Sequence, residues 1–211
     1  MNKSQINTKL QNILNKYDWL DVENVPELIA LADDLKMDVY HETVSHDKSL
    51  KQRNNAALSF LKKNGKKDAR PVLKYAHTVD GVKYITDTYI AFELSNDYIL
   101  PEMPENLTFP NVAGIFSQFD YDAREINLDV RDIMARYKSG LIEKLEDTNI
   151  TAISIFPDDV KNNLGLDVQR LETVVKILGT NNLKTYFKNR MVLFVNNQGA
   201  RALLCALRLY K

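Results

Sequence analysis

The stretch MVLFVNNQGARALLCALRLYK, residues 191–211, predicts a β-hairpin. Its two apolar runs, Met191 to Val195 and Ala202 to Leu209, have the length and composition of strands. Between them lie Asn196, Asn197, Gln198 and Gly199, and Asn and Gly adopt the positive φ that a tight turn requires. A hairpin this apolar should be paired within a sheet and belong to the core.

The second run is apolar on both faces if it alternates as a strand. One face would hold Leu203, Cys205, Leu207 and Leu209, and the other would hold Leu204, Ala206 and Arg208. Such a strand either lies between two packed layers or keeps one side for a ligand. The sequence leaves both explanations open.

Composition indicates an ordinary globular protein. The chain has 211 residues, of which 45% are hydrophobic, enough for one large domain or two small ones. Cys205 is the single cysteine, so no intramolecular disulfide can form, and a reducing cytoplasm is the expected location. The start, MNKSQINTKLQNILNKYDW, is polar and has no signal-peptide core, and no apolar stretch is long enough to span a bilayer. We therefore expect no membrane partner.

The charges are unevenly distributed although the formal net charge is zero. Residues 17–47 contain nine acidic residues and one basic residue, Lys36, whereas residues 48–74 contain nine basic residues and one acidic residue, Asp68. Two interpretations follow. Either these are solvated surfaces that attract each other, or residues 48–74 bind a polyanion.

The hydrophobic period predicts a helical N-terminal appendage, residues 1–54, followed by an α+β domain, residues 55–211. The appendage would contain helices over residues 3–16 and Pro26–Lys36. In the domain, a helix followed by three antiparallel strands is predicted twice. The first set is helix Asn55–Lys63, ended by Asn64 and Gly65, with strands Pro71–Thr78, Val82–Thr86 and Thr88–Leu94. The second is helix Val168–Leu178, capped by Asp167 and ended by Gly179, with strands Leu183–Phe187, 191–195 and 201–209.

Between the two sets, the proline-containing segment Ser95–Pro110 should be a loop. A helix is expected over Leu128–Lys138 and a strand over Ile150–Phe156.

Three segments resemble the sliding DNA clamp family. NNAALSFLKKNGKKDARPVLKYAHTVDGVKYITDTYIAFEL, residues 54–94, is similar to the opening of a clamp domain and includes its Thr-Asp strand at Thr86 and Asp87. FPNVAGIF, Phe109–Phe116, looks like the proline-containing motif that comes after it in many clamps, and ALLCALRLYK, residues 202–211, looks like the C-terminal strand. The resemblance covers roughly residues 55–211.

The resemblance implies a DNA-clamp-like domain of two helix-plus-antiparallel-meander halves and a non-enzymatic role in DNA replication as a processivity factor. Clamps bind double-stranded DNA without reading its sequence, and the residues expected to do so are Lys62, Lys63, Lys66, Lys67 and Arg70. Leu207, Arg208 and Leu209 would bind a peptide from a DNA polymerase or another replication protein. A closed ring would require a homo-oligomer. Lys- and Asn-rich usage suits a phage or mobile element.

An alternative is a regulatory protein-interaction module on the same fold, without DNA binding. A divalent-metal nuclease is a third hypothesis. Its evidence is the acidic cluster Asp120, Asp122, Glu125, Asp129 and Asp132, which lacks the spacing of a calcium loop and is typical of a solvated face. His41 and His46 are five residues apart and do not share a helix face, so they do not form a zinc motif. No nucleotide-binding or nucleophile motif is present, and we expect no catalysis, cofactor or metal.

Overall fold

The structure is a computed structural model, and it describes residues 48–67, 70–145, 148–157 and 163–209. Gln52–Lys211 forms a compact unit of its own, and this unit contains both sheets of the fold. The helices predicted over residues 3–16 and Pro26–Lys36 lie outside the described residues, as do His41 and His46.

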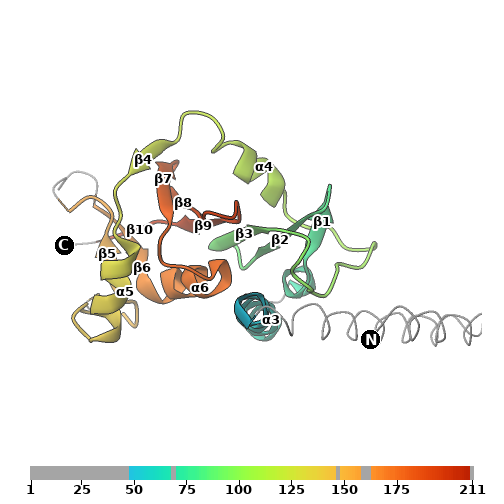
Figure 1. The fold of residues 1–211 in the computed structure, drawn as a ribbon, viewed down its shortest axis with the longest axis horizontal. Coiled ribbons are helices and arrows are strands. Elements are labelled where there is room, and N and C mark those ends of the chain that lie inside the picture. Colours follow the sequence, from blue (N-terminus) through green and yellow to red (C-terminus); the bar gives the residue numbers. More distant parts are fainter. Residues whose placement is uncertain (1–47, 68–69, 146–147, 158–162, 210–211) are drawn as a thin grey trace, which may run out of the picture. The chain divides into compact units, whose positions relative to one another are not determined.

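A sheet of seven strands, every neighbouring pair antiparallel, organises the unit (Figure 1). Its order is β1-β2-β3-β9-β8-β7-β4. The strands are β1 His77–Val79, β2 Val82–Thr86, β3 Ile90–Leu94, β4 Arg124–Ile126, β7 Lys184–Lys188, β8 Met191–Val195 and β9 Arg201–Cys205. A smaller antiparallel sheet has the order β10-β6-β5, with β5 Ala152–Ser154, β6 Leu164–Asp167 and β10 Leu207–Arg208. The α+β class with antiparallel sheets is therefore confirmed.

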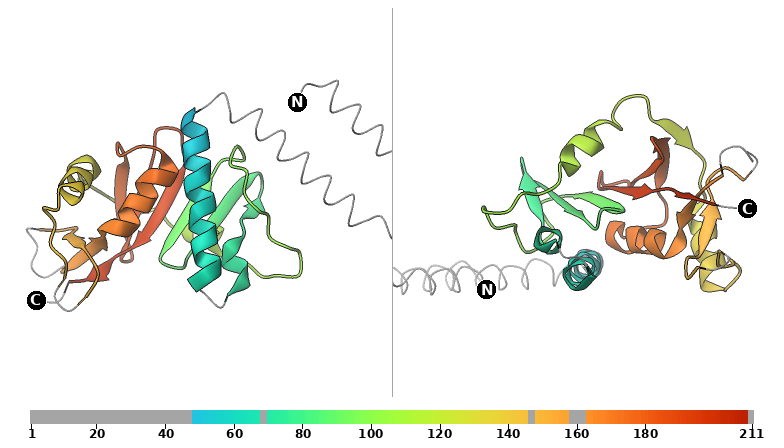
Figure 2. Two further views of the ribbon diagram at one scale, coloured as in Figure 1. Left: turned by 90° about the horizontal axis from the view of Figure 1, so that it is seen from below. Right: turned by 180° about the vertical axis from the view of Figure 1, so that it is seen from behind.

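Helices cover both faces of the seven-stranded sheet. Two long helices, α3 (Lys48–Lys67) and α6 (Val168–Leu178), lie side by side on one face (Figures 1 and 2), with α5 (Val130–Lys138) beside α6. The short helix α4 (Val112–Ser117) packs on β2 and β3 from the opposite face. A 3₁₀ helix, η2 (Pro71–Lys74), connects α3 to β1.

Strand alternation divides the core into two apolar clusters. In β8, Val192 and Phe194 face α3 and α6, whereas Leu193 packs with Phe116 of α4 in the other cluster. In β9, Leu203 likewise faces the α4 side, while its neighbours in the strand face the long helices. The first explanation for a strand apolar on both faces therefore holds for β9, which lies between two packed layers.

A helix followed by three antiparallel strands occurs twice along the chain. The first set is α3, β1, β2 and β3, and the second is α6, β7, β8 and β9. The sets join where β3 pairs with β9, with Phe92 opposite Ala202. Because each set contributes its third strand to this pair, one continuous sheet carries both helices on the same face.

Sequence patterns located several elements correctly. Helix α6 has the predicted bounds, with Asp167 accepting hydrogen bonds from the backbone N–H groups of Gln169 and Arg170, and Gly179 ending it at a φ of 74°. Strands β2 and β8 also match their predictions. Turn residues Asp80 and Gly81 both have positive φ, as a tight β1–β2 turn requires.

Other predictions were wrong for tertiary reasons. The first helix does not end at Asn64, because the Asn64 side chain is buried and donates to the backbone oxygens of Leu73 and Thr86 rather than terminating the helix. Pro71 starts a 3₁₀ helix instead of a strand, since its fixed φ suits the first position of a helix. No element was predicted over residues 112–117, 124–126 and 164–166, where the structure has α4, β4 and most of β6.

The predicted terminal strand, residues 201–209, is interrupted. Strand β9 ends at Cys205, and the backbone N–H of Ala206 donates to the Arg190 oxygen at 2.8 Å. Strand β10 then leaves the large sheet and pairs with β6 in the small one. The expected alternation is thus correct only as far as Cys205.

In the described part of the chain, no helix has the length and apolar character needed to cross a membrane.

The central position of β9 yields a stability prediction. Leu204 is fully buried in the central strand, so Leu204→Ala should lower the free energy of unfolding by about 2–5 kcal/mol through lost burial and a residual cavity. Leu141, with 67% of its surface exposed, is the matched control. Leu141→Ala should change the free energy of unfolding by less than about 0.5 kcal/mol. Urea unfolding measures both. Equal losses would contradict the placement of β9 in the core.

Candidate functional site

A groove of about 660 Å³ lies between α3 and α6. Figure 2 shows the two helices side by side across the sheet. The lining side chains are mostly polar or charged: Asn55, Ala56, Ser59, Phe60, Lys63, Asp87, Tyr137, Asp167, Gln169, Arg170, Glu172, Thr173 and Lys176. A groove of this size exceeds the space that loose packing leaves in a protein interior, so it is the first candidate for a binding site.

The α3 wall follows from helical spacing. Asn55, Ser59 and Lys63 are four residues apart, which places them on one face of the helix, and all three are exposed. Ala57 and Leu61 point to the sheet and are buried. The amphipathic pattern therefore turns a polar stripe of α3 toward the groove.

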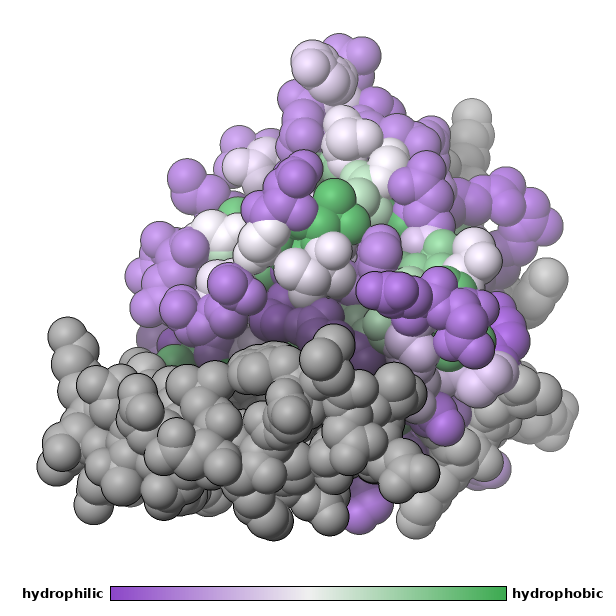
Figure 3. Space-filling model, turned by 90° about the vertical axis from the view of Figure 1, so that its right-hand side faces the viewer, coloured by the Kyte–Doolittle hydropathy of each residue, from purple (hydrophilic) through white to green (hydrophobic). Residues whose placement is uncertain are grey.

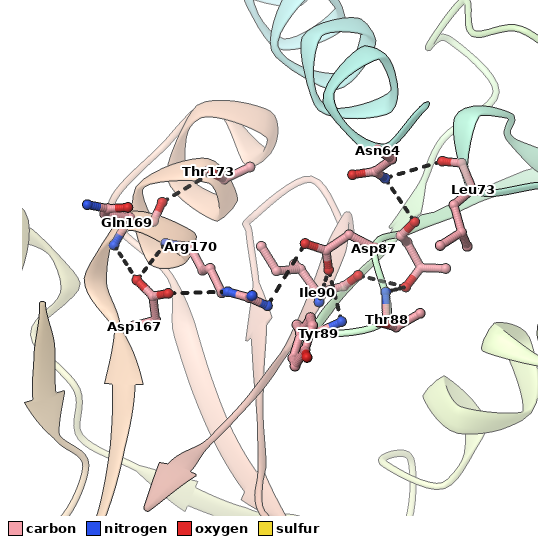
Figure 4. Close-up of polar contacts among 11 residues, drawn as sticks. Asn64, Leu73, Asp87, Thr88, Tyr89, Ile90, Asp167, Gln169, Arg170 and Thr173 are labelled. Carbon is pink, nitrogen blue, oxygen red and sulfur yellow. Dashed lines mark hydrogen bonds and ion pairs between the residues drawn. The ribbon is translucent and has the colours of Figure 1, made fainter. Parts of the chain in front are cut away.

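Arg170, in the first turn of α6, connects the two repeated sets (Figure 4). Its Nε lies 3.2 Å from Asp167 Oδ2, and its Nη1 lies 3.9 Å from Asp87 Oδ2 in the β2–β3 turn. The guanidinium also lies over the Tyr89 ring, 3.9 Å from its centroid, within the range of a cation–π interaction. One arginine thus contacts two carboxylates and an aromatic ring at the end of the groove.

The β2–β3 turn is held by side-chain hydrogen bonds (Figure 4). Asp87 Oδ1 accepts from the backbone N–H groups of Tyr89 and Ile90, at 2.9 and 2.7 Å. Thr86 Oγ1 accepts from the N–H of Thr88 at 2.9 Å and donates to the Ile90 oxygen at 2.8 Å. Asp87 is therefore both a structural acceptor and the charged partner of Arg170.

Arg53 of α3 makes the corresponding contact on the other side. Its Nη1 donates to Gln198 Oε1, in the β8–β9 turn, at 2.6 Å. Asn196 organises that turn as Asp87 does the first, since its Oδ1 accepts from the N–H groups of Gln198 and Ala200. Each long helix therefore sends an arginine to the turn of the other set.

Arg53 and Arg170, the two crossing arginines that contact the turn of the other set, each have an atom without a hydrogen-bond partner in the described part of the chain. Among the described residues, Arg53 Nε and Arg170 Nη1 are the buried side-chain atoms without a hydrogen-bond partner. Arg53 also lies 6.0 Å over the ring of Tyr98, whose hydroxyl donates to the Ile177 oxygen at 2.7 Å. Burial raises the pKa of Tyr98, so this hydroxyl keeps its proton at neutral pH.

Lys176 and Arg201 form further ion pairs. Lys176 lies 2.9 Å from Glu172, one turn earlier on α6. On the opposite sheet face, Arg201 binds Glu93 through two hydrogen bonds of 2.6 and 2.7 Å and binds Asp120 at 2.7 Å. Hydrogen bonding to Glu93 raises the pKa of Arg201, which stays charged.

The acidic cluster is not assembled as a metal site. Asp120 pairs with Arg201, and Asp129 caps α5 by accepting from the N–H of Asp132 at 2.9 Å. Within the described ranges, no three His, Cys, Asp or Glu side chains gather as ligands of one ion. Cys205 is half-buried, and burial raises the pKa of its thiol.

The predicted DNA-binding residues lie on or near α3. Lys62 and Lys63 are exposed, and neither forms an ion pair with a residue that the structure describes. The backbone of Lys66 and Lys67 belongs to α3, but their side chains lie outside the described part. Arg70 is exposed just before η2.

The predicted partner-binding residues lie at β10, in the small sheet. Leu207 is half-buried and Arg208 exposed. Leu209 packs on Gly165 of β6 so closely that a Cβ added to this glycine would meet Leu209 Cδ2 at 2.6 Å. The apolar surface of these residues is therefore partly used within the small sheet. They belong to a different element from the groove residues of α3.

The sequence did not reveal the contact of Arg170 with Asp87 and Tyr89, because its members belong to different repeated sets. A local signal existed only for Asp87, which follows Thr86 and precedes a β-branched residue in a turn. On the face that Figure 3 shows, small apolar areas are interrupted by hydrophilic residues.

No protein-family model, no curated protein and no solved structure matches the chain. We therefore infer its function from its own residues and their geometry.

The two roles of Asp87 can be separated by mutation. Asp87→Asn keeps an oxygen that accepts from the Tyr89 and Ile90 N–H groups but removes the charge facing Arg170. Because the Asp87–Arg170 ion pair is partly exposed, its loss should change the free energy of unfolding only slightly. Asp87→Ala removes both and should lower the free energy of unfolding by about 1–3 kcal/mol. Urea denaturation should rank wild type and Asn close together and Ala well below. Equal losses for Asn and Ala would assign the effect to charge.

Proposed function

We propose that the chain is a non-enzymatic, DNA-replication-associated protein that resembles a sliding clamp and binds double-stranded DNA without sequence preference. One observation carries the proposal. Two helix-plus-three-strand sets share one antiparallel sheet and lay α3 and α6 on the same face, where α3 exposes Lys62 and Lys63. The resemblance of residues 54–94 to the opening of a clamp domain supports the same proposal.

The electrostatics of the groove favour an anionic ligand on the α3 side. Asp87 and Asp167 share Arg170, and Glu172 contacts Lys176, so each of these acidic groups already has a cationic partner on α6. Lys62 and Lys63 on α3 have no ion-pair partner among the described residues. Positive charge that is not neutralised internally remains available to phosphates.

The residue types indicate contact with the DNA backbone rather than with base edges. Lysine is a flexible point charge, and its contacts to phosphates position a protein without reading sequence. Binding of this kind releases counterions and weakens steeply as salt rises. A weak, sequence-independent interaction is the form of binding that a replication accessory protein on DNA requires.

A second candidate function is a regulatory module that binds a protein partner, such as a DNA polymerase, and not DNA. The internal pairing of the groove supports it as well, because a wall that carries both Lys176 and Glu172 does not present one sign of charge. The exposed Arg208 beside the half-buried Leu207 is the surface the sequence assigns to that partner.

Charge reversal on α3 tests DNA binding. The double variant Lys62→Glu/Lys63→Glu should weaken binding to a fluorescent duplex at least tenfold at low salt, and it should lower the slope of log K against log salt by about 0.9 for each lost phosphate contact. The matched control reverses two exposed lysines outside α3 and α6, Lys144→Glu/Lys184→Glu, with the same change in net charge. Fluorescence anisotropy between 50 and 200 mM salt measures both.

Only a specific loss in the α3 variant supports the proposal. Equal weakening by the control would assign binding to net charge alone. A wild-type chain that retains no duplex at low salt would favour the protein-interaction function.

A further inference from the structure

Tyr89 is an exposed aromatic residue beside two residues that line the groove. Its side chain keeps 53% of its surface accessible, in the turn between β2 and β3. The neighbouring Asp87 and the contacting Arg170 both line the groove. Figure 4 shows the ring next to these two residues. An aromatic ring left this accessible beside a polar groove has a surface that folding does not use.

The backbone holds this ring outward against a local conformational preference. Thr88 has a φ of 78°, a region that β-branched residues rarely adopt and that is unfavourable for them. The hydrogen bonds from the N–H groups of Thr88 to Thr86 Oγ1 and of Tyr89 to Asp87 Oδ1 fix this conformation. The turn is thus built so that Tyr89 stays at one position on the surface.

Arg170 gives the ring a defined orientation. Its guanidinium lies 3.9 Å from the ring centroid, so one face of Tyr89 is stacked on a cation. Arg170 is itself held by Asp167 at 3.2 Å. The part of the Tyr89 ring that Arg170 does not cover is accessible to solvent. Such an aromatic surface can stack on another flat π-system.

We propose that Tyr89 is a stacking platform for an unpaired base of single-stranded DNA. The identity of the ligand rests on the proposed function, since the groove beside Tyr89 includes Lys63, the residue expected to attract phosphates. In a duplex the bases are stacked on each other and a single surface ring does not reach them, whereas bases of a single strand stack on aromatic side chains without sequence preference. The platform therefore adds affinity for single-stranded segments next to duplex DNA.

The test compares a fluorescent oligo-dT with a duplex of equal length, using the full chain and anisotropy at one salt concentration. Tyr89→Ala should weaken binding of oligo-dT by about 5- to 140-fold, the range for losing one base stack, and leave duplex affinity unchanged. Tyr89→Phe keeps the ring and should bind like wild type. Tyr121→Ala is the matched control, because Tyr121 is also an exposed tyrosine, at 73%, away from α3 and α6, and should bind like wild type. Thermal melts verify that all variants are folded.

The outcomes separate this inference from the proposed function. If wild type binds duplex and Tyr89→Ala binds oligo-dT normally, the platform is overturned and the proposed function stands. If duplex binding is absent while oligo-dT binding depends on the Tyr89 ring, the platform stands and the duplex-binding function is overturned. Equal losses for both ligands, or a loss in Tyr89→Phe equal to that in Tyr89→Ala, overturn stacking. Failure of wild type to bind either ligand overturns both.

Discussion

The antiparallel pairing of β3 with β9 is the constraint on which the rest of the structure depends. It joins two segments that are far apart in the sequence, with Ile90 opposite Leu204 and Phe92 opposite Ala202. Since neighbours across an antiparallel pair share a face, this register aligns the apolar faces of the two repeated sets. A slip by one residue would place Phe92 and Leu204 on opposite faces of the sheet, so one of them would turn away from the long helices. The pairing thereby fixes α3 and α6 on one face and creates the groove between them.

The two crossing arginines result from this arrangement but end in different surroundings. Arg53 packs on the end of α6, because its side chain fills the space that a Cβ on Gly179 would need, and Gly179 also has the positive φ that ends α6. Arg170 instead lines the groove and contacts Tyr89. Similar halves therefore place one arginine in a structural role and the other at the candidate site. Of the two aromatic rings beside these arginines, Tyr89 next to Arg170 is exposed, whereas Tyr98 next to Arg53 is buried.

Local chemistry explains which parts of the fold could be predicted from the sequence. The Asp167 cap, the Gly179 stop and the apolar spacing between them all act within α6, so its bounds were predictable. The turn at Asn196 to Gly199 was predictable for the same reason, since Gly199 has a φ of 85° and Asn196 accepts from its own turn. Asn64 was misread because its hydrogen bonds go to other elements, which a local pattern does not contain. The contact of Arg170 with Asp87 was invisible for that reason too.

The mixed charge of the groove is consistent with weak association and not with tight, specific recognition. Each acidic side chain in the Asp87, Arg170 and Asp167 contact is partly exposed, so these pairs contribute little to stability and their main effect is on the local field. Each carboxylate near α6 has a cationic partner on that helix, whereas Lys62 and Lys63 on α3 are unpaired among the described residues. Under the proposed function, a backbone phosphate would be attracted to the α3 wall only. Contact with one wall would leave the strand free to exchange along the groove, and the Tyr89 ring beside the groove would distinguish an unpaired base from a stacked one.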